Sequence, residues 1–143
     1  IEPARLSLGQ QFSKDQPIIL ADAMGRLAGL YGLAQAAFVG GSLVDEGGHN
    51  PLEPAALGVP VLFGPHMADF ASESQGLLQA GGARRVIDEH SLEQALAALL
   101  ANPGEAKQMG LVAKEVFETN QGAAARTADL IEQVCNWGTA DGR

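Results

Sequence analysis

The sequence predicts an α/β fold built on a doubly wound, Rossmann-like parallel sheet. Short apolar runs flanked by turn residues alternate with longer stretches of helical spacing. The apolar runs do not alternate with polar residues, as expected for parallel strands buried on both faces. Right-handed crossovers between such strands place helices on both sides of the sheet.

Composition limits what this fold can do. The chain has 143 residues, of which 46% are hydrophobic and 18% charged, so a disordered or low-complexity protein is excluded. The formal net charge of −8 argues against binding nucleic acid or anionic lipid by bulk electrostatics. The single cysteine, Cys135, excludes an internal disulfide framework. No apolar run reaches the roughly 18 residues that a membrane span requires.

The first half of the chain shows three strands and two helices. In order, we expect a strand at 17–20, a helix from about 23 to 35, a strand at 37–40, a short helix at 51–57 and a strand at 59–63. Gly58 suits the position just after the short helix, and Pro60 prevents the helix from continuing. Proline is tolerated near the start of a strand.

The second half is mostly helical. We expect a helix at 72–80, a weaker strand at 84–87, a helix capped by Ser91 that ends near Ala101, and two further helices up to about Trp137. Apolar residues recur at helical spacing in these helices, which predicts that they pack in the core. They are Leu92, Leu96, Leu99, Leu130, Ile131 and Val134.

The first sixteen residues hold at most one strand, near Arg5 to Leu8. A nucleotide-binding sheet of this kind normally has one more strand and helix before that point. The chain also begins at Ile1 rather than methionine. We therefore expect a domain truncated at its N-terminus, with residues 1–137 as the partial domain and 138–143 as a frayed tail.

The carboxyl ends of parallel strands are where such sheets bind ligands. After the second of these strands, a glycine-rich loop leads to a helix start with Asn50 as N-cap, Pro51 in the first turn and Glu53 at the third position. Glu53 has two interpretations. Its carboxylate either reaches back to the backbone N–H of Asn50 as in a capping box, or accepts hydrogen bonds from two ribose hydroxyls of a nucleotide.

An earlier loop opens the first expected helix, with Asp22 as its N-cap. Gly25 in the first turn costs about 1 kcal/mol relative to alanine. Either a phosphate approaches the free backbone amides there, or the helix packs closely on the sheet. Arg26 either pairs with an anion or lies in solvent.

Other chemistries find no support. The sequence lacks a P-loop, a nucleophile elbow and a G-x-G-x-x-G turn. His49, His66 and Asp69 could converge on a metal, but their spacing is not that of a metal site, so we expect none. His66 either touches a substrate or only terminates its strand.

Four segments together resemble the Kdo (3-deoxy-D-manno-octulosonic acid) transferases of Gram-negative bacteria. They are Asp22-x-Met24-Gly25, then Ala37-Phe38-Val39-Gly40-Gly41-Ser42-Leu43, then Gly47-Gly48-His49-Asn50-Pro51-Leu52-Glu53, and Pro60-Val61-Leu62-x-Gly64-Pro65-His66. Asn120-Gln121-Gly122-Ala123 also matches a turn near the C-terminus of that family. The resemblance covers most of residues 18–123.

The resemblance implies the C-terminal half of a GT-B glycosyltransferase, in which two Rossmann-like domains face each other across a cleft. These enzymes transfer Kdo from the donor CMP-Kdo to a lipid A precursor in lipopolysaccharide biosynthesis, without a metal or a cofactor. They work at the cytoplasmic face of the inner membrane. The resemblance assigns membrane docking to the missing part and leaves this fragment soluble, with no nucleic acid partner.

The resemblance also implies which residues bind CMP. One family stretch is Met-Gly-Glu, and Met24 and Gly25 match it while Arg26 replaces the glutamate. The other is matched in full by Asn50, Pro51, Leu52 and Glu53. The family's catalytic base is a glutamate of the missing N-terminal domain, so we expect this fragment alone to be inactive.

Two other functions remain open from the sequence. One is another GT-B enzyme that uses a uridine nucleotide, either a transferase or an epimerase. The other is a non-enzymatic nucleotide-binding module of the same fold.

Overall fold

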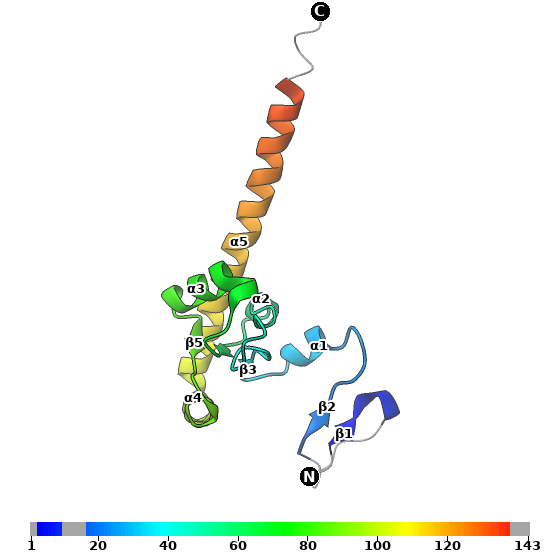
Figure 1. Cartoon of the computed structure of the whole chain (residues 1–143), viewed down its shortest axis with the longest axis vertical. Coiled ribbons are helices and arrows are strands. Elements are labelled where there is room, and N and C mark those ends of the chain that lie inside the picture. The colour runs from blue at the N-terminus through cyan, green and yellow to red at the C-terminus, as the bar shows by residue number, and fades with distance from the viewer. Residues whose placement is uncertain (1–2, 10–16, 138–143) are drawn as a thin grey trace, which may run out of the picture. The chain divides into compact units, whose positions relative to one another are not determined.

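The structure, a computed structural model, describes residues 3–9 and 17–137. It forms two compact units, Ile1–Ala34 and Gln35–Arg143, which are described separately (Figure 1). The tail expected to fray, 138–143, lies outside the described residues. The expectation of one partial domain over 1–137 stays a prediction.

The N-terminal unit contains a pair of short parallel strands. Strand β1 (Ala4–Arg5) pairs with β2 (Ile19–Leu20), and Ala4 lies opposite Ile19. A 3₁₀ helix follows β1 at Leu6–Leu8. The strand expected at 17–20 is present but shorter than predicted. The strand expected near Arg5 to Leu8 is wrong except at Arg5, because Leu6–Leu8 form the 3₁₀ helix.

Helix α1 is also shorter than predicted, because it spans only Leu27–Tyr31 instead of about 23 to 35. Gly25 has a φ of +76°, a left-handed conformation that cannot belong to a right-handed helix. The helix therefore begins only after this residue. Asp22 does not cap it, since the residue before α1 is Arg26 and has no side-chain capping bond.

The larger unit is built on a three-stranded parallel sheet in the order β3–β4–β5. The strands are β3 (Ala37–Phe38), β4 (Val61–Phe63) and β5 (Ala83–Arg85). Helix α2 (Leu52–Ala56) connects β3 to β4, and α3 (Ala71–Ala80) connects β4 to β5 after a 3₁₀ turn at Ala68–Phe70. Helices α4 (Glu89–Ala101) and α5 (Pro103–Trp137) follow.

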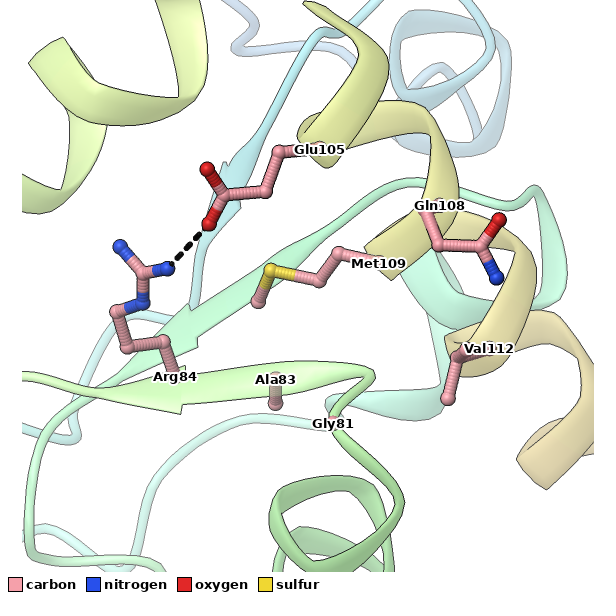
Figure 2. A pocket seen from close by; sticks show the side chains of 7 residues that line it. All are labelled: Gly81, Ala83, Arg84, Glu105, Gln108, Met109 and Val112. Atoms are coloured by element: carbon pink, nitrogen blue, oxygen red, sulfur yellow. Dashed lines mark hydrogen bonds and ion pairs between the residues drawn. The ribbon is translucent and has the colours of Figure 1, made fainter. Parts of the chain in front are cut away.

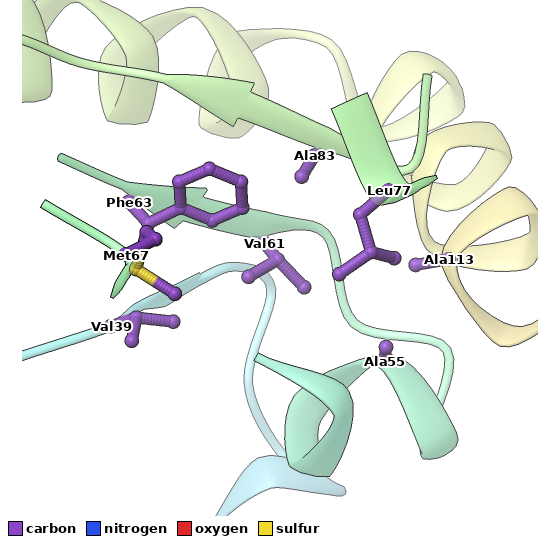
Figure 3. Close-up of a cluster of buried hydrophobic side chains, with 8 residues drawn as sticks. All are labelled: Val39, Ala55, Val61, Phe63, Met67, Leu77, Ala83 and Ala113. Atoms are coloured by element: carbon purple, nitrogen blue, oxygen red, sulfur yellow. The ribbon is translucent and has the colours of Figure 1, made fainter. Parts of the chain in front are cut away.

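Hydrophobic clusters cover both faces of this sheet. On one face, buried side chains of β4 meet those of α2, α3 and α5, as Figure 3 shows for Val61, Phe63, Ala55, Leu77 and Ala113. On the other face, buried residues of α4 and of the start of α5 pack around the fully buried Leu62. Helices on both faces of a parallel sheet confirm the predicted doubly wound fold.

Two predictions for the last helices are wrong. Residues 103–137 form one continuous helix rather than two, and the expected turn at Asn120-Gln121-Gly122-Ala123 is helical. No proline occurs after Pro103, so no residue forces a break there. Leu130 and Ile131, expected in the core, are 60% and 58% exposed, and Figure 1 shows this part of α5 extending beyond the sheet.

The cap of α4 also differs from the prediction. Asp88, not Ser91, is the N-cap, and its carboxylate accepts a hydrogen bond from the Ser91 backbone N–H at 2.7 Å. The Ser91 hydroxyl accepts one from the Asp88 N–H at 3.0 Å, which completes a capping box. The bonds from Ser91 hold the pKa of Asp88 below its usual value.

Two glycines of α5 provide a matched test of its packing. A Cβ on Gly110 would overlap the carbonyl oxygen of Gly58, whereas a Cβ on Gly104 would meet nothing within 4 Å. We expect Gly110→Ala to lower the free energy of unfolding by roughly 1–3 kcal/mol because it overpacks the contact between α2 and α5. Gly104→Ala should be neutral or stabilising by up to about 1 kcal/mol. Urea unfolding measures both, and equal effects would contradict the packing described here.

Candidate functional site

The buried side chain of Ser42 joins the carboxyl ends of β3 and β4. Its hydroxyl donates a hydrogen bond to the carbonyl of Val39 and accepts one from the backbone N–H of Gly64 at 2.8 Å. Its backbone carbonyl accepts the N–H of His66 at 3.0 Å. The loop 40–50 after β3 and the loop 64–70 after β4 are therefore held together by one residue. No role for Ser42 was predicted, although a small polar residue that directly follows a strand and two glycines is a signal for one.

Close packing between these two loops explains three of their glycines. A Cβ on Gly47 would lie 2.6 Å from a carboxylate oxygen of Asp69, and a Cβ on Gly48 would lie 2.5 Å from the sulfur of Met67. A Cβ on Gly64 would overlap the carbonyl of Ser42. A glycine-rich loop permits the close approach of another backbone or of a phosphate. At Gly47 and Gly48 the neighbouring loop already occupies that space.

Helix α2 begins one residue later than predicted, so Pro51 rather than Asn50 stands directly before it. The Asn50 side-chain oxygen still accepts a hydrogen bond from the N–H of Leu52, the first helical residue, at 3.0 Å and so satisfies a free amide at the helix start. Pro51 is fully buried and Leu52 packs against the hydrophobic cluster on this face. These two side chains therefore anchor the start of the helix.

Glu53 makes no capping contact, in contrast to Asn50. It is exposed, and within the described part of the chain its carboxylate makes no hydrogen bond and no ion pair. The bond back to the N–H of Asn50 that a capping box requires is not formed among these residues. Of the two interpretations of Glu53, the structure thus removes the support for the cap and leaves the carboxylate free to bind.

The other predicted site residues belong to the N-terminal unit. Met24 is fully exposed, and Arg26 is exposed with no side-chain hydrogen bond or ion pair to any described residue. Arg26 lies at a pocket of about 630 Å³. The other residues that line this pocket are Leu6, Ser7, Ala23, Gly29 and Leu30.

Gly25 is required for its conformation and not for close packing. A Cβ placed on it would meet nothing within 4 Å, so the packing of a helix on the sheet does not explain it. Its positive φ, which disfavours any residue with a side chain, explains why a glycine stands there. This leaves the backbone around Gly25 open on its outer side.

Asp22 holds the segment before α1 through hydrogen bonds to its carboxylate. Its carboxylate accepts hydrogen bonds from the hydroxyl of Ser7 at 2.6 Å, from the backbone N–H of Ser7 at 2.8 Å and from Arg5 at 2.9 Å. These bonds, those from Ser7 first, lower the pKa of Asp22 to about 2. Asp22 thus joins β1 and the 3₁₀ helix to the segment before α1, in place of the predicted capping role.

The structure brings Asn50 and Glu53 together at the start of α2 and keeps Met24, Gly25 and Arg26 together before α1. These groups lie in different units, so the idea that both contact one nucleotide stays a prediction.

His49, His66 and Asp69 do not form a metal site in the part of the chain that the structure describes. No group of three histidine, cysteine or acidic residues could hold a metal ion among the residues described. His66 instead faces Asp45 of the neighbouring loop, with 3.6 Å between Nδ1 and Oδ1. His49 lies in loop 40–50 and His66 in loop 64–70, the two loops that Ser42 joins at the carboxyl ends of β3 and β4.

A second pocket lies at the opposite end of the sheet. It has a volume of about 440 Å³ and begins at Gly81, next to the amino end of β5, so it is separate from the joined loops. Figure 2 shows Arg84 and Glu105 paired at its edge, with 2.9 Å between their atoms, beside Met109. The remaining lining residues are Ala83, Gln108 and Val112.

Among the described residues, no helix combines the length and the apolar character needed to cross a membrane.

Comparison with known proteins supports the resemblance. No protein-family model matches the chain. The 3-deoxy-D-manno-octulosonic acid transferase of Haemophilus influenzae is 39% identical over 129 residues, which are 90% of this chain and 30% of that protein. The transferase of the same name from Bordetella pertussis is 34% identical over 115 residues, 80% of this chain and 27% of that protein. The chain thus spans less than a third of these curated relatives.

A solved structure is similar as well. The crystal structure of the C-terminal CMP-Kdo binding domain of WaaA from Acinetobacter baumannii matches with a TM-score of 0.75 and 35% sequence identity. The match covers 80% of this chain and 60% of that domain. The predicted resemblance to Kdo transferases and the predicted fold class are both confirmed.

The role of Ser42 can be tested by removing its hydroxyl. We expect Ser42→Ala to lower the free energy of unfolding by about 1–3 kcal/mol, because the buried Gly64 N–H loses its acceptor. The exposed Ser72 on α3 serves as control, and Ser72→Ala should change stability by less than about 0.5 kcal/mol. Chemical denaturation followed by circular dichroism measures both, and a neutral Ser42→Ala would rule out the joining role.

Proposed function

We propose that this chain is the donor-binding part of a glycosyltransferase that moves Kdo from CMP-Kdo to a lipid A precursor in lipopolysaccharide biosynthesis. The observation that carries the proposal is the similarity in fold and sequence to a CMP-Kdo binding domain. The similarity to the two curated transferases supports the same assignment.

In this proposal Glu53 binds the ribose of the nucleotide. A carboxylate can accept hydrogen bonds from two neighbouring hydroxyls, and each such charged bond contributes about 1.5–3 kcal/mol. The carboxylate of Glu53 is exposed and has no hydrogen bond or ion pair to a described residue, which supports this role. Asn50, Pro51 and Leu52 fix the start of the helix that carries it.

Met24, Gly25 and Arg26 form the second contact. The left-handed Gly25 exposes the surrounding backbone, and Arg26 provides a guanidinium at the rim of the pocket before α1. Because Arg26 stands where the related transferases have a glutamate, its contact differs in kind from theirs. A guanidinium pairs with anionic oxygens, which the donor carries on its phosphate and its sugar carboxylate.

The rest of the reaction belongs to the remainder of the full-length protein. We assign the catalytic base, the lipid A precursor and the docking to the cytoplasmic face of the inner membrane to that part, and none to this chain. No metal and no cofactor takes part in this proposal. The chain carries a net charge of −8, which disfavours contact with anionic lipid and with nucleic acid.

Nucleotide titration of the full-length protein tests the function. Isothermal titration calorimetry should show CMP binding at least about tenfold more tightly than UMP or UDP, because a site that pairs with the cytosine edge rejects the uracil edge. Tighter binding of UDP would instead indicate another GT-B enzyme. No response to any nucleotide would indicate a module without this function.

A single substitution tests the site. Glu53→Gln keeps the size of the side chain but weakens its bonds to a diol, so CMP affinity should fall about tenfold, or about 1.4 kcal/mol. The melting temperature should stay nearly unchanged, since Glu53 is exposed and its side chain makes no hydrogen bond or ion pair to a described residue. Glu115→Gln, on the exposed side of α5, is the matched control and should change neither value. Loss of stability with unchanged affinity would restore the capping interpretation.

A further inference from the structure

The two loops joined by Ser42 carry acidic side chains that repel the proposed anionic donor. Loops 40–50 and 64–70 contain no lysine or arginine, but they contain three acids, Asp45, Glu46 and Asp69. The donor carries negative charge on its phosphate and on its sugar carboxylate, so these acids repel it. In these two loops only His49 and His66 can hold a positive charge or donate a ring N–H toward an anion.

His66 is held in place by its backbone and by the next residue. Its backbone N–H bonds to the carbonyl of the buried Ser42, and the next residue, Met67, is buried against Gly48. The imidazole itself is 41% exposed, so a ligand can reach it. This is a rigid backbone that carries an accessible polar ring.

The Asp45 carboxylate faces one nitrogen of this ring. Nδ1 lies 3.6 Å from the Asp45 carboxylate, which is ion-pair range in the neighbouring loop. The two nitrogens of an imidazole act separately, and a carboxylate that faces one leaves the other for a ligand. In His66 that nitrogen is Nε2.

We propose that His66 binds an anionic oxygen of the donor through Nε2, and so offsets the acidic character of the loops at this edge of the sheet. The inference rests on the proposed function and adds a binding residue to it. The anionic oxygen has two sources in the donor, the nucleotide phosphate and the carboxylate of the sugar.

Three ligands and a small set of variants test the inference in the full-length protein. Cytidine carries neither anionic group, CMP carries the phosphate, and CMP-Kdo carries both. His66→Phe keeps a planar ring without nitrogens, His66→Ala removes the ring if the larger side chain prevents folding, and His66→Gln restores an N–H donor. His90→Phe is the matched control, because His90 is an exposed histidine on α4 that also faces a carboxylate, 4.0 Å away at Glu93.

We expect His66→Phe and His66→Ala to weaken binding about tenfold, as the loss of one charged hydrogen bond predicts. His66→Gln should recover part of the loss, and His90→Phe should have no effect. Weaker binding of both CMP and CMP-Kdo places the contact at the phosphate, and weaker binding of CMP-Kdo alone places it at the sugar carboxylate. Cytidine should bind all variants equally.

The same measurements distinguish a wrong role for His66 from a wrong proposed function. If the unsubstituted protein binds CMP and Glu53→Gln weakens that binding, but the His66 variants bind both nucleotides as before, only the role of His66 is overturned. An equal loss of cytidine affinity would also overturn it, because the effect would then not depend on the anion. If the unsubstituted protein binds no cytidine nucleotide, both proposals fall.

Discussion

The buried hydroxyl of Ser42 is the interaction on which the proposed binding edge depends. It closes the end of β3 onto the start of the loop after β4, and the backbone of the same residue holds His66. A polar group buried in this way is costly unless all its bonds are made, so it strongly favours one arrangement of the two loops. Asn50 and α2 follow directly from the loop that it fixes, which connects the core of the sheet to the site.

Local sequence signals predicted those parts of the fold that depend on local chemistry. The buried strand β4, the capping bond of Asn50 and the end of α2 at Gly58, with its φ of +71°, are as expected because each is determined by a few neighbouring residues. Strand β2 is not, since Ile19 and Leu20 are exposed although their apolar run predicted burial. The errors arise where distant contacts decide. Asp22 is a plausible cap by spacing, but Ser7, fifteen residues away, binds its carboxylate instead. The single helix α5 follows from an absence of breaking residues, which a sequence pattern indicates only weakly.

The candidate site was predictable in its residue types and less so in their roles. The spacing of Asn50 and Glu53 predicted a helix start, yet spacing alone could not separate a capping carboxylate from a binding one. The described hydrogen bonds include one from the helix start to Asn50 and none to the Glu53 carboxylate, which leaves the capping interpretation of Glu53 without support. The glycines show the opposite case. Their number predicts a close neighbour without identifying it. At Gly47 and Gly48 the neighbour is the next loop, which only the coordinates reveal.

An acidic domain can bind an anionic donor only if the attraction is local. Beyond about 10 Å in physiological salt the net charge is largely screened, whereas a hydrogen bond acts within about 3 Å. A few fixed donors therefore outweigh a net charge of −8, provided that the backbone holds them still. The close packing of Gly47, Gly48 and Gly64 provides that rigidity, because none of the three can accept a side chain without displacing its neighbour. In the proposed site the glycines would serve binding indirectly, by fixing the loops that carry the polar groups.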